Sequence, residues 1–277
     1  MSKKKKNKNN NKKVGIIGIG VVGRAWALAV TRKTFAGVMS SPVLYDKYRG
    51  IGSVEGINRA DIIFVCVPTP YKRSIGFDSS SIEDAFSVIK GRKIVVIKST
   101  VTPGTTERMQ NKYPNHLVLF NPEFLREETA DKDASNPFEQ IIGYTKKSRK
   151  TAKKILKILP RAPYEFIVPA TEAEVFKYFS NTFLATKVIF ANQFYNLCQK
   201  LKIDYERVKG MARVSPRFSF SHFDIWVNGY RGYKGACLPK DTKALIQFGD
   251  KIKVDLKLLK MIDKINEEIL RSQKIKT

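Results

Sequence analysis

The sequence has 277 residues, with 51 lysines and arginines against 25 aspartates and glutamates, which gives a formal net charge of +26. A hydrophobic content of 43% is typical of a folded protein and excludes a chain that is disordered throughout. No stretch predicts a transmembrane helix, and three cysteines without metal-type spacing argue against a disulfide scaffold or a zinc ribbon. We therefore expect a cytoplasmic protein of one or two domains, without a metal site or a membrane partner.

Much of the positive charge lies in two segments. Residues 1–13 hold seven lysines and no acid, so we expect a disordered basic tail, through which alone nucleic acid would bind. Residues 146–161 hold eight basic residues and no acid. The apolar residues of this second segment recur at helical spacing: Ala152, Ile155, Leu156 and Leu159. That stripe favours an ordinary helix packed on a core over a helix that binds nucleic acid or a membrane surface.

A glycine-rich turn follows the first predicted strand. Gly18, Gly20 and Gly23 form the pattern G-x-G-x-x-G. Such glycines permit a tight turn, the approach of a pyrophosphate and close packing of a helix against a strand. The second predicted strand ends in Asp46, an acid suited to the hydroxyls of an adenosine ribose. This combination predicts a dinucleotide site that prefers NAD to NADP.

Further strands follow at a spacing typical of βαβ units. In all, strands are predicted at residues 14–18, 42–46, 61–67, 93–98, 116–120 and 140–144. Residues 81–90 form a predicted helix between two of them. Two strands end in polar turns that hold Thr69 and Thr100, where a doubly wound sheet binds its ligand. The predicted class is α/β: an N-terminal Rossmann-type doubly wound parallel sheet, at residues 14–169, followed by a mostly α-helical domain, at residues 170–277.

A long helix is predicted near residues 171–200. Thr171 and Glu174 have the spacing of a capping box that opens this helix. Three of its aromatic residues are expected to pack in the core: Phe176, Phe179 and Phe183. Lys177 and Asn181 lie four residues apart, so a cation and an amide on one face can stabilise a developing oxyanion. The alternative is a solvated lysine beside a surface asparagine.

Two short segments carry most of the reactive groups. Glu123 and Glu127 follow the fifth predicted strand and are expected to point two carboxylates at the ligand crevice. Cys237, Lys240 and Asp241 bring a thiol, a cation and a base within one helical turn. The cation favours the nucleophilic thiolate, and the aspartate can act as a base. The other two cysteines are expected to be small buried hydrophobic residues: Cys66 and Cys198.

Six segments are together far more specific than the glycines alone. They are G-I-G-V-V-G, C-V-P-T-P, K-S-T-V-T-P-G, N-P-E-F-L-R-E, K-Y-F-S-N and G-A-C-L-P-K-D-T-K. In this order they resemble the UDP-glucose/GDP-mannose dehydrogenase family. The resemblance implies NAD-dependent oxidation of the C6 alcohol of a nucleotide sugar to a carboxylate, with UDP-glucose as the default substrate and polysaccharide biosynthesis as the setting. Lys234 stands where the family has glycine, and we expect the family's C-terminal UDP-binding domain to be absent.

The resemblance also implies roles for the candidate residues. Cys237 would capture the aldehyde as a thiohemiacetal and later a thioester, and Asp241 would act as the base. The implied catalytic residues are Cys237, Asp241, Lys177, Asn181, Glu127 and Thr100. The residues implied to contact NAD are Gly18, Gly20, Gly23, Asp46, Thr69, Thr100, Glu127 and Lys240. Those implied to contact the substrate are Glu123, Phe124, Leu125, Arg126, Glu127, Lys177 and Asn181.

The resemblance further implies a homodimer that forms through the central helices. Other functions remain open at this point. One is a catalytically degenerate NAD-binding member of the family that acts as a partner-binding subunit. Another is a GDP-mannose 6-dehydrogenase. A basic, nucleic-acid-associated protein is supported only by the two basic segments.

Overall fold

The structure is a computed structural model that describes residues 12–32, 41–72 and 74–273. The predicted basic tail therefore lies outside the described residues, apart from Lys12 and Lys13. The chain divides into two compact units. Of the described residues, those in the ranges 1–70 and 78–177 form the first unit, and those in the ranges 71–77 and 178–277 form the second.

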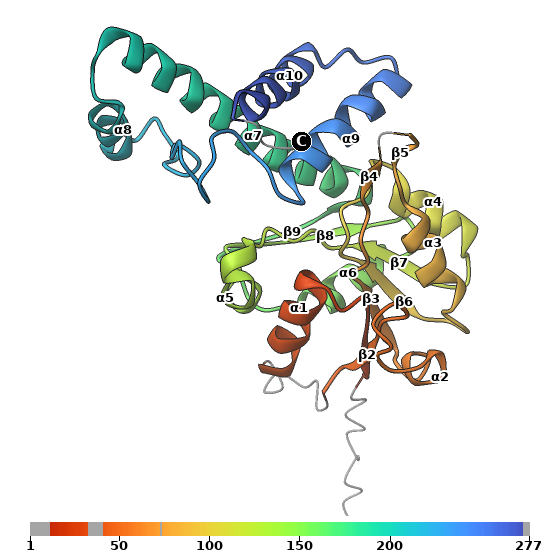
Figure 1. The fold of residues 1–277 in the computed structure, drawn as a ribbon. Coiled ribbons are helices and arrows are strands. Elements are labelled where there is room, and N and C mark those ends of the chain that lie inside the picture. The colour runs from red at the N-terminus through yellow and green to blue at the C-terminus, as the bar shows by residue number, and fades with distance from the viewer. Residues whose placement is uncertain (1–11, 33–40, 73, 274–277) are drawn as a thin grey trace, which may run out of the picture. The chain divides into compact units, whose positions relative to one another are not determined.

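A seven-stranded sheet forms the centre of the first unit (Figure 1). Its strands are β1 (Val14–Ile17), β2 (Val43–Tyr45), β3 (Ile62–Val65), β6 (Ile94–Ile97), β7 (Leu117–Phe120), β8 (Glu139–Tyr144) and β9 (Tyr164–Pro169). Their order in the sheet is β2-β1-β3-β6-β7-β8-β9, and every neighbouring pair is parallel except β7 with β8. The prediction of a Rossmann-type α/β fold is confirmed, with one antiparallel pairing in a mostly parallel sheet.

The strand order reverses beside β1, which lies between β2 and β3. In an open α/β sheet such a reversal places the ligand crevice at the carboxyl ends of the strands. Strands β1, β3 and β6 are buried along their whole length, as expected when helices cover both faces. The sequence did not predict β9, because most of its residues are exposed and the strand lacks a buried apolar run.

Helices cover both faces of this sheet. One apolar core contains side chains of α1 (Val21–Arg32), α5 (Ala130–Ser135) and α6 (Arg149–Leu156). The core on the other face contains side chains of α2 (Val54–Ile57), α3 (Ser80–Ser87) and α4 (Thr105–Lys112). The helix predicted at residues 81–90 is therefore present as the shorter α3.

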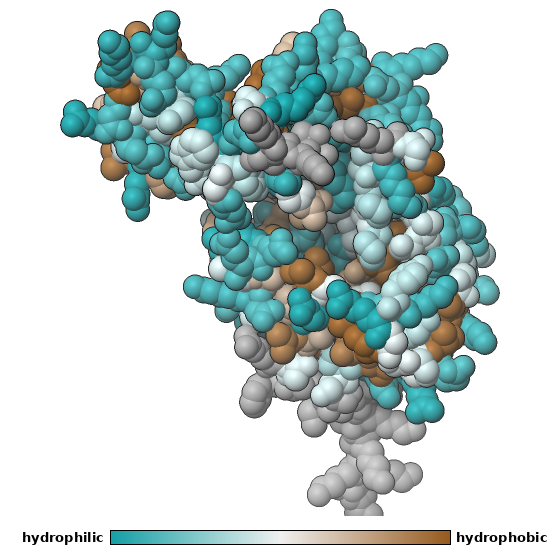
Figure 2. Space-filling model, viewed as in Figure 1, coloured by the Kyte–Doolittle hydropathy of each residue, from teal (hydrophilic) through white to brown (hydrophobic). Residues whose placement is uncertain are grey.

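The basic segment at residues 146–161 contains the packed helix α6. Ala152, Ile155 and Leu159 are fully buried in the core, whereas Lys153 and Lys154 are exposed. The prediction of an ordinary packed surface helix is confirmed. The visible face of the molecule is mostly hydrophilic, with separate hydrophobic patches (Figure 2), as a lysine-rich surface requires.

Two predictions about helix α7 (Ala170–Leu201) are wrong. The predicted capping box is wrong, because the helix begins before Thr171 and the Glu174 carboxylate binds another segment instead. The predicted core stripe is also wrong. Phe176, Phe179 and Phe183 are 37%, 66% and 53% exposed. Polar side chains with internal partners lie on the buried side of the helix, whereas these three phenylalanines lie on its exposed side.

The second unit is mostly helical. Besides most of α7, it contains α8 (Tyr205–Val214), α9 (Leu238–Lys251), α10 (Lys257–Ser272) and a hairpin of β4 (Tyr71–Lys72) and β5 (Gly76–Phe77). Side chains of α7 and α10 share one small apolar core. The hairpin is attached to α9, because the Phe77 amide donates to Oε1 of Gln247 at 3.0 Å. None of the helices in the described part of the chain is long and apolar enough to cross a membrane.

The predicted domain boundary, between residues 169 and 170, coincides with the junction of β9 and α7. The division between the compact units falls about two helical turns later, between residues 177 and 178. The boundary therefore stays a prediction.

We expect Ile155→Ala to destabilise the protein by about 2–5 kcal/mol, because the substitution leaves a cavity in a core that buries this side chain completely. The free energy of unfolding in urea measures the effect. Lys153→Ala on the same helix is the matched control and should change that free energy by less than about 0.5 kcal/mol, because Lys153 is exposed. Equal effects of the two substitutions would contradict the packing of α6 described above.

Candidate functional site

The glycine-rich turn between β1 and α1 has the geometry of a pyrophosphate site. Gly18 has a φ of +90°, in the left-handed region that glycine adopts readily. A Cβ on Gly23 would lie 1.9 Å from the Gly18 carbonyl oxygen, so α1 packs against the turn as closely as only glycine permits. A Cβ on Gly20 would meet nothing within 4 Å, so this face of the turn is open. An anion can therefore approach the backbone at the N-terminus of α1.

Asp46 lies beside the same turn, directly after β2. Its Oδ2 accepts a hydrogen bond from the Ile19 amide at 2.8 Å. Its Oδ1 accepts hydrogen bonds from the amides of Tyr48 and Arg49 at 3.0 and 3.1 Å. These bonds fix the carboxylate and leave acceptor capacity on Oδ2, which accepts a single amide hydrogen bond. The residues present thus fit the pyrophosphate and the adenosine ribose of NAD.

The polar turns after β3 and β6 are joined by side-chain hydrogen bonds. Thr69 Oγ1 donates to the Thr100 carbonyl at 2.8 Å. Ser99 Oγ donates to the Val67 carbonyl at 2.7 Å. The structure therefore brings the two candidate threonines together, at the carboxyl ends of adjacent strands where a doubly wound sheet binds its ligand.

Lys177 and Glu123 form a buried ion pair in the first unit. The Lys177 ammonium lies 3.2 Å from Glu123 Oε1 and donates to the Glu123 carbonyl at 2.5 Å. Burial alone pushes the pKa of the Glu123 carboxyl up, but the Lys177 ammonium and the Leu125 amide hold it below its ordinary value. Lys177 is 4% exposed and is not a solvated surface lysine. Glu127 is not part of this pair and lies exposed in the short 3₁₀ helix η2 (Glu127–Thr129).

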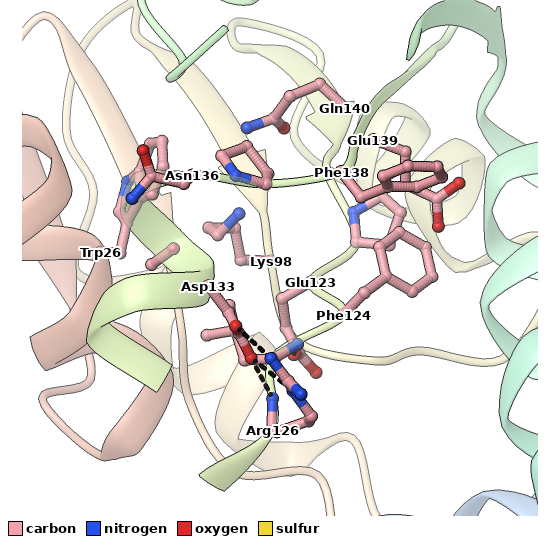
Figure 3. A pocket seen from close by; sticks show the side chains of 14 residues that line it. Trp26, Lys98, Glu123, Phe124, Arg126, Asp133, Asn136, Phe138, Glu139 and Gln140 are labelled. Atoms are coloured by element: carbon pink, nitrogen blue, oxygen red, sulfur yellow. Dashed lines mark hydrogen bonds and ion pairs between the residues drawn. The ribbon is translucent and has the colours of Figure 1, made fainter. Parts of the chain in front are cut away.

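A cavity of about 330 Å³ opens beside this pair (Figure 3). Four of the predicted substrate-binding residues line it: Glu123, Phe124, Leu125 and Arg126. The guanidinium of Arg126 is held at the wall by Asp133 through two hydrogen bonds, of 3.1 and 2.8 Å, which Figure 3 shows as dashed lines. The cavity combines aromatic rings with charged and amide side chains, which is typical of a site for a polar small molecule.

Lys98 and Trp26 are among the lining residues of this cavity that the sequence analysis missed. Lys98 is buried, donates to Asn121 Oδ1 at 2.7 Å and lies 4.4 Å from the centre of the Trp26 ring. Burial lowers the pKa of Lys98 to about 8, and nearby Cys66 and Glu123 oppose this shift. The Trp26 indole nitrogen is buried and has no hydrogen-bond partner in the described part of the chain. In the sequence, the one signal for Lys98 was its position at the end of an otherwise apolar strand.

The second unit assembles a thiol, a base, a cation and an amide. Asp241 is 1% exposed, and its Oδ2 accepts a hydrogen bond from Asn181 Nδ2 at 2.5 Å. The Lys240 ammonium donates to the other carboxylate oxygen. Lys240 and Asp241 lie in the first turn of α9, and Cys237 occupies the N-cap of that helix. The structure thus places the predicted thiol, cation and base within one turn, and α7 contributes Asn181 to them.

The three cysteines differ in their surroundings. Cys66 and Cys198 are buried, as predicted, and burial raises the pKa of the Cys66 thiol to about 12. Cys237 is exposed at the start of a helix, where the N-terminal dipole favours a thiolate. Among these thiols, Cys237 is therefore the one suited to nucleophilic chemistry.

The sheet, the glycine turn and Asp46 define a Rossmann-type dinucleotide-binding protein. Comparison with models of known protein families identifies the family. The model for the NAD binding domain of the UDP-glucose/GDP-mannose dehydrogenase family matches residues 38–159, and the model for its central domain matches residues 171–268. The chain belongs to this family, and its cofactor is NAD. The glycine turn precedes the first matched range, so its assignment depends on the geometry described above.

Individual proteins that are similar to this chain in sequence or structure support the assignment to this family. UDP-glucose 6-dehydrogenase YwqF of Bacillus subtilis is 35% identical over 226 residues, which cover 76% of this chain and 50% of the relative. UDP-glucose 6-dehydrogenase TuaD of the same organism is 32% identical over 229 residues, or 77% of this chain and 48% of the relative. The chain thus spans about half the length of these curated relatives. A UDP-glucose dehydrogenase structure from Pyrobaculum islandicum has a TM-score of 0.82 at 27% identity, covering 96% of this chain and 70% of that chain.

We expect Ellman's reagent to modify a single thiol of the folded protein rapidly at pH 8. Cys237 is exposed, whereas the other two thiols are buried. Cys237→Ser should abolish the rapid phase, and Cys198→Ser should leave it unchanged. Unfolding in guanidinium should make all three wild-type thiols reactive. A rapid phase that survives Cys237→Ser would contradict this assignment.

Proposed function

We propose that the protein oxidises the C6 alcohol of a nucleotide sugar, UDP-glucose by default, to the carboxylate with NAD⁺. The observation that carries the proposal is the arrangement at the start of α9. An exposed thiol at the helix N-terminus precedes a buried aspartate that Asn181 and Lys240 hold in place. Membership of the family supports the reaction class, and the similarity to two UDP-glucose 6-dehydrogenases supports UDP-glucose.

Cys237 explains how an alcohol can be oxidised twice. Bound NAD⁺ supplies the hydride acceptor, and two molecules are consumed for each sugar. After the first oxidation, the Cys237 thiolate adds to the aldehyde carbon, forming a C–S bond and a thiohemiacetal. The second oxidation removes the hydride of that carbon and leaves a thioester. Water then adds to the thioester carbon, and the C–S bond breaks to give the carboxylate and the free thiolate.

Polar residues of the candidate site are proposed to accept protons and to stabilise charge. Asp241 is proposed to take a proton from the attacking water, since its fixed carboxylate retains acceptor capacity. Lys177 and Asn181 are proposed to stabilise the oxyanions of the thiohemiacetal and of its hydrolysis. The Glu123 carboxylate orients the Lys177 ammonium, and Thr100 and Glu127 are proposed to position the reacting hydroxyl and a water.

The cavity beside Glu123 is proposed to hold the hexose. Its volume of about 330 Å³ is at the lower end of ligand sites and suits a single sugar ring. Phe124 and Trp26 provide apolar surface, and Arg126 and Lys98 provide hydrogen-bond donors. A sugar presents both an apolar ring face and hydroxyl groups, so this lining matches its chemistry.

We expect two NADH for each UDP-glucose oxidised, measured from NADH absorbance against the uronate formed. Cys237→Ser should abolish the second oxidation, because a serine hydroxyl does not give a thioester. Asp241→Asn should lower kcat by about 10²–10⁴-fold through loss of the base. Asp250→Asn, on the same helix but exposed at its other end, is the matched control and should leave kcat unchanged.

The outcomes separate the candidate functions. Oxidation of GDP-mannose but not of UDP-glucose would assign the chain to the other substrate of the family. Binding of NAD⁺ without oxidation of either nucleotide sugar would contradict the proposed activity. It would favour a catalytically degenerate subunit that binds a partner.

We also propose that the protein forms a homodimer through α7. Large apolar side chains of this helix are exposed at intervals of three, four or seven residues: Phe179, Phe183, Phe190, Phe194, Leu197 and Leu201. Such spacing places them on one side of a helix, in the pattern of a helix that pairs with another helix. Exposed apolar surface of this extent is typical of a protein–protein interface.

We expect light scattering to give twice the chain mass of 31.5 kDa for the wild type and a single chain mass for Phe190→Glu. A carboxylate buried in an apolar interface without a partner opposes association. Gln199→Glu adds the same charge at an exposed position on the opposite side of α7 and should leave the dimer intact. A monomeric wild type would overturn the proposal.

A further inference from the structure

Glu174 of α7 is a buried carboxylate that binds the start of another helix. Its side chain is fully buried, its Oε2 accepts from the Gly104 amide at 2.6 Å, and its Oε1 accepts from the Thr106 amide at 2.7 Å. The Thr106 hydroxyl donates to Oε1 as well, at 2.6 Å. These donors belong to the N-terminus of α4, where free amides and the helix dipole favour a negative charge.

This contact fixes one end of the turn that carries Thr100. The other end is fixed by Ser99, whose hydroxyl donates to carbonyls at the end of β3. Between these anchors, the Thr100 carbonyl accepts from the Thr69 hydroxyl. Gly104, the residue before α4, has a φ of +88° and no side chain with which to cap the helix. Glu174 therefore supplies from α7 the cap that the turn itself lacks.

We propose that Glu174 is a positioning residue that orders the Thr100 turn for NAD binding, and that its ionisation state controls this order. The inference takes Thr69 and Thr100 as contacts of NAD, the role that the resemblance to the family implies for them, and otherwise does not rest on the proposed function. It assigns Glu174 no contact with the cofactor or the substrate. Glu174 acts through the backbone of Gly104 and Thr106.

The ionisation of Glu174 falls in the neutral pH range. Burial raises the pKa of its carboxyl to about 7, against the hydrogen bonds from Thr106 and Gly104. Among the described residues, the charged group that acts on it is Glu107 of α4, whose negative charge raises the pKa further. On protonation, one carboxylate oxygen becomes a hydroxyl, and the neutral group accepts more weakly from the amides that face it than the carboxylate does. Below about pH 7, the start of α4 therefore loses part of its anchor.

The pH dependence of binding and that of stability have opposite signs. The carboxyl pKa is higher in the folded protein than the ordinary 4.5, so the folded state holds the proton more tightly than the unfolded state. Between these values the contribution of Glu174 to folding stability falls as pH rises. NAD binding requires the ionised carboxylate. It therefore strengthens as the pH rises through about 7. If Glu174 only supported the fold, the pH dependence of NAD binding would not run opposite to that of stability.

Isothermal titration of NAD⁺ at pH 6, 7 and 8 tests the proposal. For the wild type we expect up to about tenfold weaker binding at pH 6 than at pH 8, because one proton is linked to binding through a group that titrates near pH 7. Binding at pH 6.5 should release protons, detected as a dependence of the heat on the buffer. Glu174→Gln should bind weakly at every pH and release no proton.

Two further variants sharpen the test. Glu172→Gln removes the same charge from an exposed position two residues earlier on α7 and should behave as the wild type. Thr106→Val keeps the amide but removes the hydroxyl that stabilises the carboxylate, so the midpoint of the binding profile should move to higher pH. Circular dichroism and thermal melting confirm that each variant is folded.

Wild-type affinity and pH dependence in a folded Glu174→Gln protein would overturn the proposal, as would a wild type that binds NAD⁺ equally at all three pH values. The readout is binding, so it is independent of turnover. If NAD⁺ binds with the expected pH profile but no nucleotide sugar is oxidised, the proposed activity fails and the role of Glu174 stands.

Discussion

The structure depends on one constraint, which is that polar groups buried by α7 must find partners inside the protein. Glu174 meets it with the amides of α4, Lys177 with Glu123, and Asn181 with Asp241. Each partner belongs to a segment that carries candidate chemistry. The buried polar side of one helix therefore fixes the Thr100 turn, the wall of the cavity and the base that follows the thiol. It also explains why the phenylalanines of the helix lie outside.

The sequence predicted the parts that depend on local pattern. Buried parallel strands appear as short apolar runs, and Gly18 and Gly23 are required by backbone geometry that no other residue meets. The misses concern partners that are distant in sequence. The spacing of Thr171 and Glu174 matches a capping box, yet the carboxylate binds a helix about 70 residues earlier, and spacing cannot reveal this. An aromatic stripe likewise identifies one side of a helix without showing whether that side is buried. Lys98 was missed because its burial depends on Asn121 and Trp26.

The few acidic residues of this basic chain are used in specific places. Asp46 fixes the glycine turn, Glu123 orients Lys177, and Asp241 binds Asn181 and Lys240. The large positive charge of the sequence is consistent with a dinucleotide-binding protein whose acids serve its sites, and it requires no nucleic acid partner.

The hairpin of residues 71–77 has a consequence for dissecting the protein. It lies in the sequence between two strands of the central sheet but packs with the helical unit, where Gln247 accepts from the Phe77 amide. The chain therefore passes between the two units three times. No single cut can separate them, and a fragment that starts at residue 178 would expose the surface of α9 that the hairpin covers. Recombination between relatives would preserve both units only if the hairpin and α9 were exchanged together.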